Sequence, residues 1–393
     1  MPRTCPLSLA PGYARLQEEG PVARVTMPNG EPAWMVTRHH EVRQALTDPR
    51  LSSDRTRDGY PLFPGIPSRE VMRESFRGGI MGMDPPEHTV HRRLLLPEFT
   101  VRRVQALRPR IQEIVDGCLD AVLAGGPPVD LVQALSLPVP AQVICDMLSM
   151  PLADREGVDQ LTRVTLRPDA DPDDRAAAMA ELRRIFQALV DAREDDPGND
   201  LLGRMITSYR AAGLYDRELM ARMVGALLSG GHETTASMIS LGTVALLERP
   251  DQLAKLRRDP GLLPRAVEEL LRYFTPLAEF SGYRAAVDDI ELGGVRIAAG
   301  EGLIAHGATA NRDPAAFDRP DDLDVERQAH HHLAFGYGVH QCLGQHLARV
   351  ELEVVFASLF DRLPDLRLAV PLDELEFRDH LAIYGLPRLP VTW

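Results

Sequence analysis

Helical patterns of apolar and polar residues dominate the chain from about Asp84 to Leu271. The longest of them runs from Arg217 to Glu248, where apolar residues recur at helical spacing. Near the N-terminus, two short extended runs, Val22 to Met27 and Ala33 to Thr37, flank Pro28-Asn29-Gly30. Asn-Gly tolerates positive φ, so this arrangement predicts a β-hairpin. The pattern as a whole predicts a mainly α protein with small β-sheets.

Turn signals organise the rest of the chain. A second hairpin is expected around Gly293-Gly294, and the stretch from Leu366 to Trp393 is typical of strands interrupted by prolines. The proline-rich segment from Arg55 to Pro67 predicts a long loop. The acidic segment from Pro168 to Asp174 predicts a connector between helices.

Composition and charge exclude several classes of protein. The chain has 393 residues, of which 44% are hydrophobic and 26% charged, as in ordinary globular proteins. A formal net charge of −13 argues against a nucleic-acid-binding protein, which normally carries a basic face. The sequence shows neither a secretory leader nor a bilayer-spanning run, so we expect a cytoplasmic protein that does not bind membranes. Its four scattered cysteines are expected to be reduced thiols.

One cysteine, Cys342, lies in a glycine-rich stretch directly before a helical pattern. The stretch consists of Phe335-Gly336-Tyr337-Gly338-Val339-His340-Gln341-Cys342-Leu343-Gly344. Gly336 and Gly338 permit a tight turn, and Gly344 leaves room at the start of the following helix. A thiolate beside a helix N-terminus is stabilised by the helix dipole. A rigid loop of this kind suits a thiolate that binds the iron of a porphyrin, so Cys342 is a candidate haem ligand.

Other interpretations of this stretch have to be considered. A lone cysteine is often a small buried apolar residue, and glycines often mark ordinary turns. A dinucleotide-binding fingerprint fails because Gln341 stands where a glycine is required. A zinc site built from His340, Cys342 and His346 is conceivable, although structural zinc sites usually have four ligands and paired cysteines.

A second motif, Gly230-Gly231-His232-Glu233-Thr234-Thr235, lies in the middle of the longest helical pattern. Each glycine there costs about 1 kcal/mol relative to alanine, which indicates a close approach or a local distortion beside an acid and an alcohol. Such a distortion opens a groove that suits dioxygen. The alternative is that the glycines only permit two helices to cross closely. A zinc-protease motif is excluded because Ala236 occupies the position of its second histidine.

Two further pairs have helical spacing. His88 and Arg92 lie four residues apart in a segment where Asp84 or the proline pair after it begins a helix. Two cationic donors on one face suit the carboxylates of a porphyrin, although a solvated basic face has the same spacing. Glu269 and Arg272 lie three residues apart, and such a pair alone carries little information.

Together these motifs resemble the cytochrome P450 superfamily, specifically bacterial members of actinobacterial secondary metabolism. The resemblance covers most of the chain and rests on the order of its motifs. These are the Asn29-Gly30 hairpin, Asp84-Pro85-Pro86-Glu87-His88, the Gly-Gly-His-Glu-Thr-Thr helix, Glu269-x-x-Arg272, Ala310-Asn311-Arg312-Asp313-Pro314 and the cysteine stretch. It implies one domain over residues 1–393 with the cytochrome P450 fold, about a dozen helices plus small sheets.

The resemblance implies haem b as cofactor, dioxygen as co-substrate and a role for each matching residue. Cys342 would be the proximal iron ligand, with Phe335 packed beneath the ring near the sulfur. Glu233 and Thr234 would deliver protons to the distal side. The haem propionates would be held by His88, Arg92, Arg284 and His340. Glu269 and Arg272 would be structural, with a third basic partner that is either Arg327 or Arg319.

The resemblance also implies a substrate pocket and a redox partner. Pocket candidates are Ile80, Met81, Met83, Gly230, Leu277, Ala278 and Glu279. Glu279 would either receive a basic nitrogen of the substrate or form an ordinary surface salt bridge. Electrons would come from NAD(P)H through a ferredoxin and its reductase, with a monomeric enzyme as the expected state. Candidate docking residues for the ferredoxin are Arg92, Arg93, Arg102, Arg103 and Arg349.

The expected reaction is hydroxylation or epoxidation of a bulky hydrophobic natural product such as a macrolide or other polyketide. Three alternatives stay open at this point. A haem-thiolate oxidase would couple aromatic substrates with the same cofactor. A haem sensor would bind the cofactor without catalysis, and a zinc protein would use the cysteine stretch differently.

Overall fold

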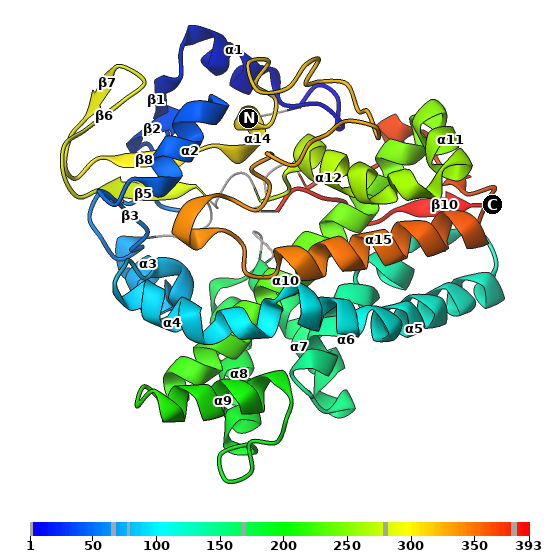
Figure 1. The fold of residues 1–393 in the computed structure, drawn as a ribbon, viewed down its shortest axis with the longest axis horizontal. Helices are drawn as coiled ribbons and strands as arrows, with labels where there is room; N and C mark the ends of the chain where they lie inside the picture. Colours follow the sequence, from blue (N-terminus) through cyan, green and yellow to red (C-terminus); the bar gives the residue numbers. More distant parts are fainter. Residues whose placement is uncertain (1–2, 64–67, 77–78, 167–169, 278–281, 379–382) are drawn as a thin grey trace.

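The computed structural model describes residues 3–63, 68–76, 79–166, 170–277, 282–378 and 383–393. Helices occupy most of the molecule, and the largest sheet lies at one side with α1 and α2 (Figure 1). The helices are α1 (Pro11–Glu19), α2 (His39–Thr47), α3 (Arg69–Phe76), α4 (Glu87–Leu95), α5 (Val101–Gly125), α6 (Pro138–Met147), α7 (Leu152–Leu166), α8 (Pro172–Asp191), α9 (Leu201–Ala211), α10 (Arg217–Leu247), α11 (Pro250–Arg258), α12 (Leu263–Phe274), α14 (Gly307–Ala310) and α15 (Gln345–Arg362).

Three small sheets complete the described fold. The strands are β1 (Val22–Thr26), β2 (Pro32–Val36), β3 (Leu51–Ser52), β4 (Val129–Asp130), β5 (Tyr283–Ala286), β6 (Ile290–Leu292), β7 (Val295–Ile297), β8 (Gly302–Ala305), β9 (Arg367–Leu368) and β10 (Pro390–Thr392). The largest sheet has the order β1-β2-β8-β5-β3, in which only β2 and β8 are parallel. The other two have the orders β4-β10-β9 and β6-β7.

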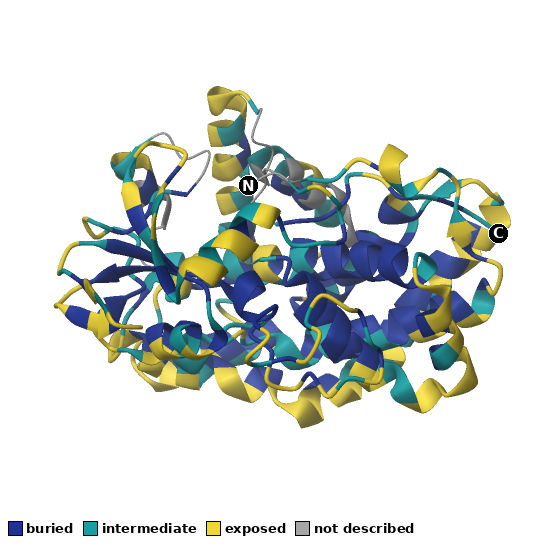
Figure 2. Ribbon diagram, turned by 90° about the horizontal axis from the view of Figure 1, so that it is seen from above, coloured by how far each residue is buried: buried dark blue, intermediate teal, exposed yellow. Residues whose placement is uncertain are grey.

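Helix α10 forms the centre of the molecule. Asp216 begins it, because its carboxylate accepts the N–H of Leu219 (2.6 Å). Most residues after Met220 are buried, and they lie on all sides of the helix, as expected of a helix enclosed by others. Buried residues gather in the interior of the molecule, and exposed residues lie mostly along its outer faces (Figure 2). At Gly242 the helix passes so close to α15 that an added Cβ would lie 2.5 Å from Cζ of Phe356.

Both predicted hairpins are present, and so is the long helix. Strands β1 and β2 pair antiparallel from Val22↔Val36 to Thr26↔Pro32, and the turn has Gly30 at φ 84°. Strands β6 and β7 pair around Gly293 and Gly294, which also have positive φ. The Asn-Gly and Gly-Gly signals are local, so the sequence alone was sufficient to place them.

The predicted acidic connector is wrong at its end, because α8 already begins at Pro172. Asp171 caps this helix by accepting the N–H of Asp173 (2.8 Å). Asp173 and Asp174 lie in the first turn, where negative charge is favoured by the helix dipole. The acidic residues therefore mark a helix start rather than a linker.

Helix α4 begins after the proline pair, not at Asp84. The carboxylate of Asp84 instead accepts the N–H of Ser53 (2.7 Å) and also contacts the hydroxyl of Ser52. This contact ties the start of α4 to β3. The same sheet carries β5, so α4 and β5 are held on one side of the site described next.

Candidate active site

Cys342 lies on a tight loop that connects the 3₁₀ turn η5 (Gly338–His340) to α15. The N–H of Cys342 donates to the carbonyl of Phe335 (2.8 Å), which closes the loop. Gly336 and Gly338 have φ of 69° and 74°, a region that glycine enters without strain. At Gly338 a Cβ would also lie 2.7 Å from the carbonyl oxygen of Leu46. Gly338 is therefore required both by its conformation and by its contact with α2.

The side chain of Cys342 faces an internal space. The residue is exposed to the space around it, but that space is enclosed by protein. Burial within the molecule therefore raises the pKa of the Cys342 thiol. The N–H of Gly344 and the charges of Arg92 and Arg349 oppose this effect by favouring the thiolate. An added Cβ at Gly336 or Gly344 would meet no described atom within 4 Å. The loop therefore presents its sulfur and two glycines to open space.

Helix α10 borders open space at Gly230. This residue is exposed although the helix around it is mostly buried, and an added Cβ there would meet no described atom within 4 Å. At Gly231 the nearest atom is Cδ1 of Ile144, at an ordinary contact distance of 3.8 Å. Close helix crossing therefore does not explain this glycine pair, whereas it does explain Gly242.

Five basic side chains from separate parts of the chain converge beside the cysteine loop. They are His88 and Arg92 from α4, Arg284 from β5, His340 from η5 and Arg55 from the loop after β3. The rings of His88 and His340 have centroids 4.0 Å apart. Nη2 of Arg92 donates to the carbonyl of Gln341 (2.6 Å), and Nη1 of Arg284 donates to the carbonyl of Tyr283 (2.7 Å). The structure thus brings together all four predicted propionate-binding residues and adds Arg55.

Asp84 is the carboxylate that acts on His88 and Arg284 in this basic cluster, and the cations outnumber it. Burial and the surrounding cations lower the pKa of His340 to about 3, and burial with Arg92 lowers that of His88 to about 4. Nδ1 of His88 and Nε2 of His340 are buried without a hydrogen-bond partner among the described residues. Buried polar groups normally have partners, so these atoms fit a ligand that carries carboxylates. The haem propionates meet that requirement.

Glu233 and Thr234 make separate contacts. The carboxylate of Glu233 is buried and pairs with Nη1 of Arg378 (3.1 Å). The hydroxyl of Thr234 donates to the carbonyl of Gly230 (2.8 Å) one turn earlier in α10. Arg378 was not anticipated from the sequence, because it lies in the irregular C-terminal segment and carries no motif.

Glu269 and Arg272 are fully buried and form a bidentate pair, with distances of 2.7 and 2.8 Å. The third basic partner is Arg327, whose Nε lies 3.1 Å from Oε1 of Glu269. Arg272 also donates to the carbonyls of Asn311 (2.8 Å) and Pro320 (2.7 Å). The pair therefore fastens α12 to the segment that precedes the cysteine loop.

The predicted pocket residues occupy different environments. Ile80 is partly buried in the 3₁₀ turn η1 (Ile80–Gly82), Met81 is half exposed, and Met83 is buried. Leu277 is partly buried just after α12. Ile80 packs against the same buried cluster as Leu343. Ala278 and Glu279 lie outside the described residues.

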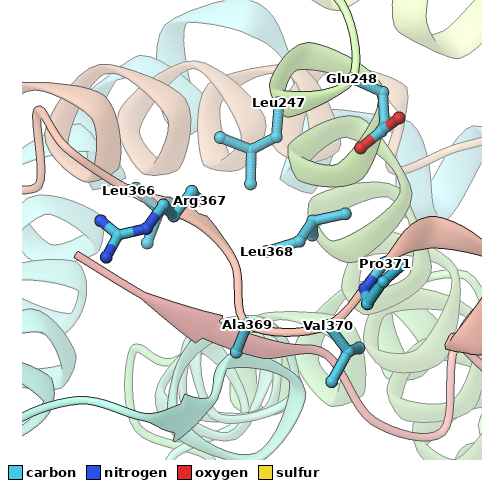
Figure 3. A pocket seen from close by; sticks show the side chains of 8 residues that line it. All are labelled: Leu247, Glu248, Leu366, Arg367, Leu368, Ala369, Val370 and Pro371. Carbon is cyan, nitrogen blue, oxygen red and sulfur yellow. The ribbon is translucent and has the colours of Figure 1, made fainter.

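A surface pocket of about 410 Å³ lies elsewhere, at the C-terminal end of α10 (Figure 3). It is lined by Leu247, Glu248 and residues 366–371. Leu247 follows Thr234 by thirteen residues, or roughly 20 Å of helix. This pocket is therefore separate from the space beside Cys342.

Two features of the described ranges bear on the class of site. These ranges contain no group of three or more His, Cys, Asp or Glu side chains placed to hold a metal ion. Within the same ranges, no helix is both long and apolar enough to cross a bilayer.

Comparison with known proteins identifies the family. The family model "Cytochrome P450" matches residues 261–379. Cytochrome P450 105A3 of Streptomyces carbophilus is 48% identical over 395 residues, which cover 100% of this chain and 94% of that protein. Vitamin D3 dihydroxylase of Streptomyces griseolus is 47% identical over 392 residues, with coverages of 100% and 95%. The crystal structure of cytochrome P450 MoxA from Nonomuraea recticatena matches with a TM-score of 0.92 at 48% identity, with coverages of 100% and 98%.

A cysteine loop beside a buried basic cluster, in a mainly helical fold, defines the class of haem-thiolate enzymes. The chain belongs to the cytochrome P450 family, and it is a monooxygenase that depends on haem and dioxygen. The resemblance to bacterial cytochromes P450 of secondary metabolism and the predicted fold class are confirmed.

Proposed function

We propose that this monooxygenase hydroxylates or epoxidises a bulky hydrophobic natural product, with electrons from a ferredoxin and its reductase. The main support for this proposal is that four basic residues converge beside Cys342: His88, Arg92, Arg284 and His340. This cluster needs buried anions, and the two partnerless imidazole nitrogens point to carboxylates. These observations support a cofactor site between the cysteine loop and α10.

Within this site the residues of the chain have distinct tasks. Bound haem supplies the reductive activation of dioxygen. Cys342 donates its thiolate to the iron, while the N–H of Gly344 and the tight loop keep the sulfur in place. The basic cluster, including Arg55, binds the propionates and relieves its own charge repulsion in doing so.

Proton delivery is assigned to Thr234 and Glu233. The Thr234 hydroxyl already donates its hydrogen to the Gly230 carbonyl. The lone pairs of its oxygen can therefore accept a hydrogen bond from a proton donor. Glu233 pairs with Arg378 in this structure, so relaying a proton requires its carboxylate to leave that partner or to act through water.

The substrate assignment is supported by the names of relatives. Vitamin D3 dihydroxylase states a hydroxylation in its name, and so does Mycinamicin VIII C21 methyl hydroxylase of Micromonospora griseorubida, which is 40% identical over 394 residues. The described lining candidates Ile80, Met81 and Leu277 are apolar, and methionine adapts its shape to irregular ligands. A large hydrophobic substrate suits such a lining better than a small polar one.

The ferredoxin assignment is supported by the surface near the cysteine loop. Helices α5 and α15 run parallel, because Arg108 pairs with Glu353, Gln112 with Ser358 and Arg362 with Asp120. This register places the first turn of α5 beside the first turn of α15. Exposed basic residues there are Arg102 and Arg103, with Arg93 at the end of α4. Their positive charge suits an acidic electron carrier.

A binding and product assay tests the proposed function. The oxidised, haem-loaded protein is titrated with macrolactones, polycyclic terpenoids and small aryl compounds, and spin-state changes are followed by absorption. We expect saturable low-to-high-spin changes with the bulky ligands, followed by a product that gains one oxygen atom from labelled dioxygen. Dimeric aryl products without labelled oxygen would instead support oxidative coupling.

A further inference from the structure

The two adjacent carboxylates of α12 serve different segments. Glu269 contacts Arg272 and Arg327, whereas Glu268 faces α15. Nε and Nη2 of Arg349 donate to Oε1 (2.5 Å) and Oε2 (3.0 Å) of Glu268, which makes this pair bidentate. Because successive residues of a helix point about 100° apart, the two glutamates address separate partners.

His332 is the second neighbour of Glu268. Its Nε2 lies 3.2 Å from Oε2 of Glu268, and its side chain is 1% exposed. Nδ1 of His332 accepts the N–H of Ala334 (3.1 Å), so the ring proton is on Nε2, which lies near the carboxylate without a hydrogen bond to it. Burial lowers the pKa of His332, and the ring is therefore neutral. The charges that meet directly here are those of Glu268 and Arg349.

Phe335 connects this charged pair to the cysteine. The guanidinium carbon of Arg349 lies 4.5 Å from the Phe335 ring centroid, and the His332 ring lies 5.8 Å away. The carbonyl of Phe335 accepts the N–H of Cys342 (2.8 Å). The ring of Phe335 therefore contacts residues that Glu268 organises, and its backbone closes the cysteine loop.

We propose that Glu268 and Arg349 form a compensated charge pair that sets the reduction potential of the iron bound at Cys342. Phe335 and His332 fix the position of that pair, so all four act as positioning residues. Arg349 is 23% exposed and committed to Glu268, which makes it a poor docking contact for a redox partner. The inference rests on the proposed role of Cys342 as iron ligand.

Electrostatics gives the two single variants opposite signs. Glu268→Gln leaves the charge of Arg349 uncompensated near the sulfur, which favours the reduced iron and raises its potential. Arg349→Met preserves an apolar stem over Phe335 but leaves the carboxylate uncompensated, which lowers the potential. The double variant removes both charges and should return towards the wild-type value. A merely structural role predicts no such reversal of sign.

Spectroelectrochemical titration of the haem-loaded proteins at one pH and ionic strength tests this proposal. We expect a positive shift for Glu268→Gln, a negative shift for Arg349→Met and an intermediate potential for the double variant. Glu353→Gln is the matched control, because Glu353 also lies on α15 but pairs with Arg108 of α5. Shifts of the same sign in both single variants, or shifts no larger than that of the control, would overturn the proposal.

Two further measurements keep the outcome interpretable. Arg349→Lys conserves the charge, so we expect it to stay near the wild-type potential. A shift as large as that of Arg349→Met would contradict the electrostatic role. The ferrous carbon monoxide spectrum of the wild type reports the ligand separately: absence of the thiolate-type band refutes Cys342 as ligand, whereas its presence without opposite shifts refutes only the charge pair.

Discussion

Thr234 is the residue of α10 for which we propose the most direct role in proton delivery. Its hydroxyl donates to the carbonyl of Gly230, and Gly230 itself borders open space. Thr234→Ala removes that hydroxyl without altering the buried faces of the helix. We expect product formation to fall about 10²-fold, the lower end for a positioned proton donor, while reductant consumption continues and hydrogen peroxide accumulates.

The matched control for this prediction is Thr235→Ala. Thr235 follows directly in α10 and is buried on another face of the helix. Product and hydrogen peroxide are measured per reductant oxidised. The assignment is wrong if Thr234→Ala retains full product yield, or if Thr235→Ala uncouples the enzyme equally.

Glu351 is a buried carboxyl group outside the proposed site. Burial raises its pKa to about 8, and its Oε2 has no hydrogen-bond partner in the described residues. In the unfolded chain the group ionises near its ordinary value of about 4.3. Between these pH values the folded protein holds the extra proton, so stability is full below about pH 4 and declines until about pH 8.

Glu351→Gln should remove this pH dependence. The free energy of unfolding of the wild type should decline relative to the variant by about 1 kcal/mol per pH unit between pH 5 and 8. Urea unfolding at several pH values gives the slope of the unfolding free energy against pH. If the glutamine changes stability by a constant amount at every pH, this slope is unaffected. Glu353→Gln, two positions later in α15, should leave the slope of the wild type intact, and equal slopes in all three proteins would contradict the account.

At the scale of elements, the crossing of α10 and α15 positions both sides of the site. Gly242 is required there, because an added Cβ would lie 2.5 Å from Phe356 and 3.3 Å from Leu270. Gly242→Ala should destabilise the protein: overpacking costs about 1–3 kcal/mol, which exceeds the gain of about 1 kcal/mol in helix propensity.

Gly117 provides the opposite case in α5. It is exposed, and an added Cβ would meet nothing within 4 Å. Gly117→Ala should therefore raise stability by up to about 1 kcal/mol. Melting temperatures of the haem-loaded variants at one scan rate give the comparison, and a Gly242→Ala variant as stable as Gly117→Ala would contradict this view of the crossing.

How far the sequence predicted these elements depended on how local each signal was. The Asn29-Gly30 turn and the spacing of His88 and Arg92 are local, and the structure contains both. Arg284 came only from the family resemblance, because β5 has four residues and its partners β3 and β8 are distant in sequence. Its contribution to the basic cluster depends on that long-range pairing.

Residues without a motif were beyond prediction. Arg55 lies in an irregular loop and Arg378 in an irregular segment, so periodicity gave no signal for either. Glu268 and Glu269 are chemically identical neighbours, and only tertiary contacts assign one to Arg349 and the other to Arg327. Arg349 was predicted as a docking residue, but the structure gives it an internal partner.

At the scale of the whole molecule, the site draws on α4, β5, α10 and the loop before α15. We propose that residues 1–393 form one domain, because separating these elements would divide the basic cluster from Cys342. Cooperative loss of haem absorption and helical signal on heating is the expected result. Two well-separated transitions would argue for independent units.

Surface charge near α5 gives a prediction about the redox partner. Replacing Arg102 and Arg103 by glutamine should slow reduction by an acidic ferredoxin at low salt and weaken the dependence of that rate on ionic strength. Arg367→Gln is the control, because Arg367 lines the surface pocket at the far end of α10. Stopped-flow reduction rates decide the matter. Equal rates and equal salt dependence in all variants would place the docking surface elsewhere.

The central claim is that Cys342 binds the haem iron through its thiolate, and the carbon monoxide spectrum of the reduced protein tests it most directly. We predict that the wild type and Cys118→Ser, which alters a buried cysteine of the core, show the red-shifted band of a thiolate complex. Cys342→Ser should lose that band even where haem is retained. A Cys342→Ser variant that keeps the band, or a wild type that lacks it, would contradict the account.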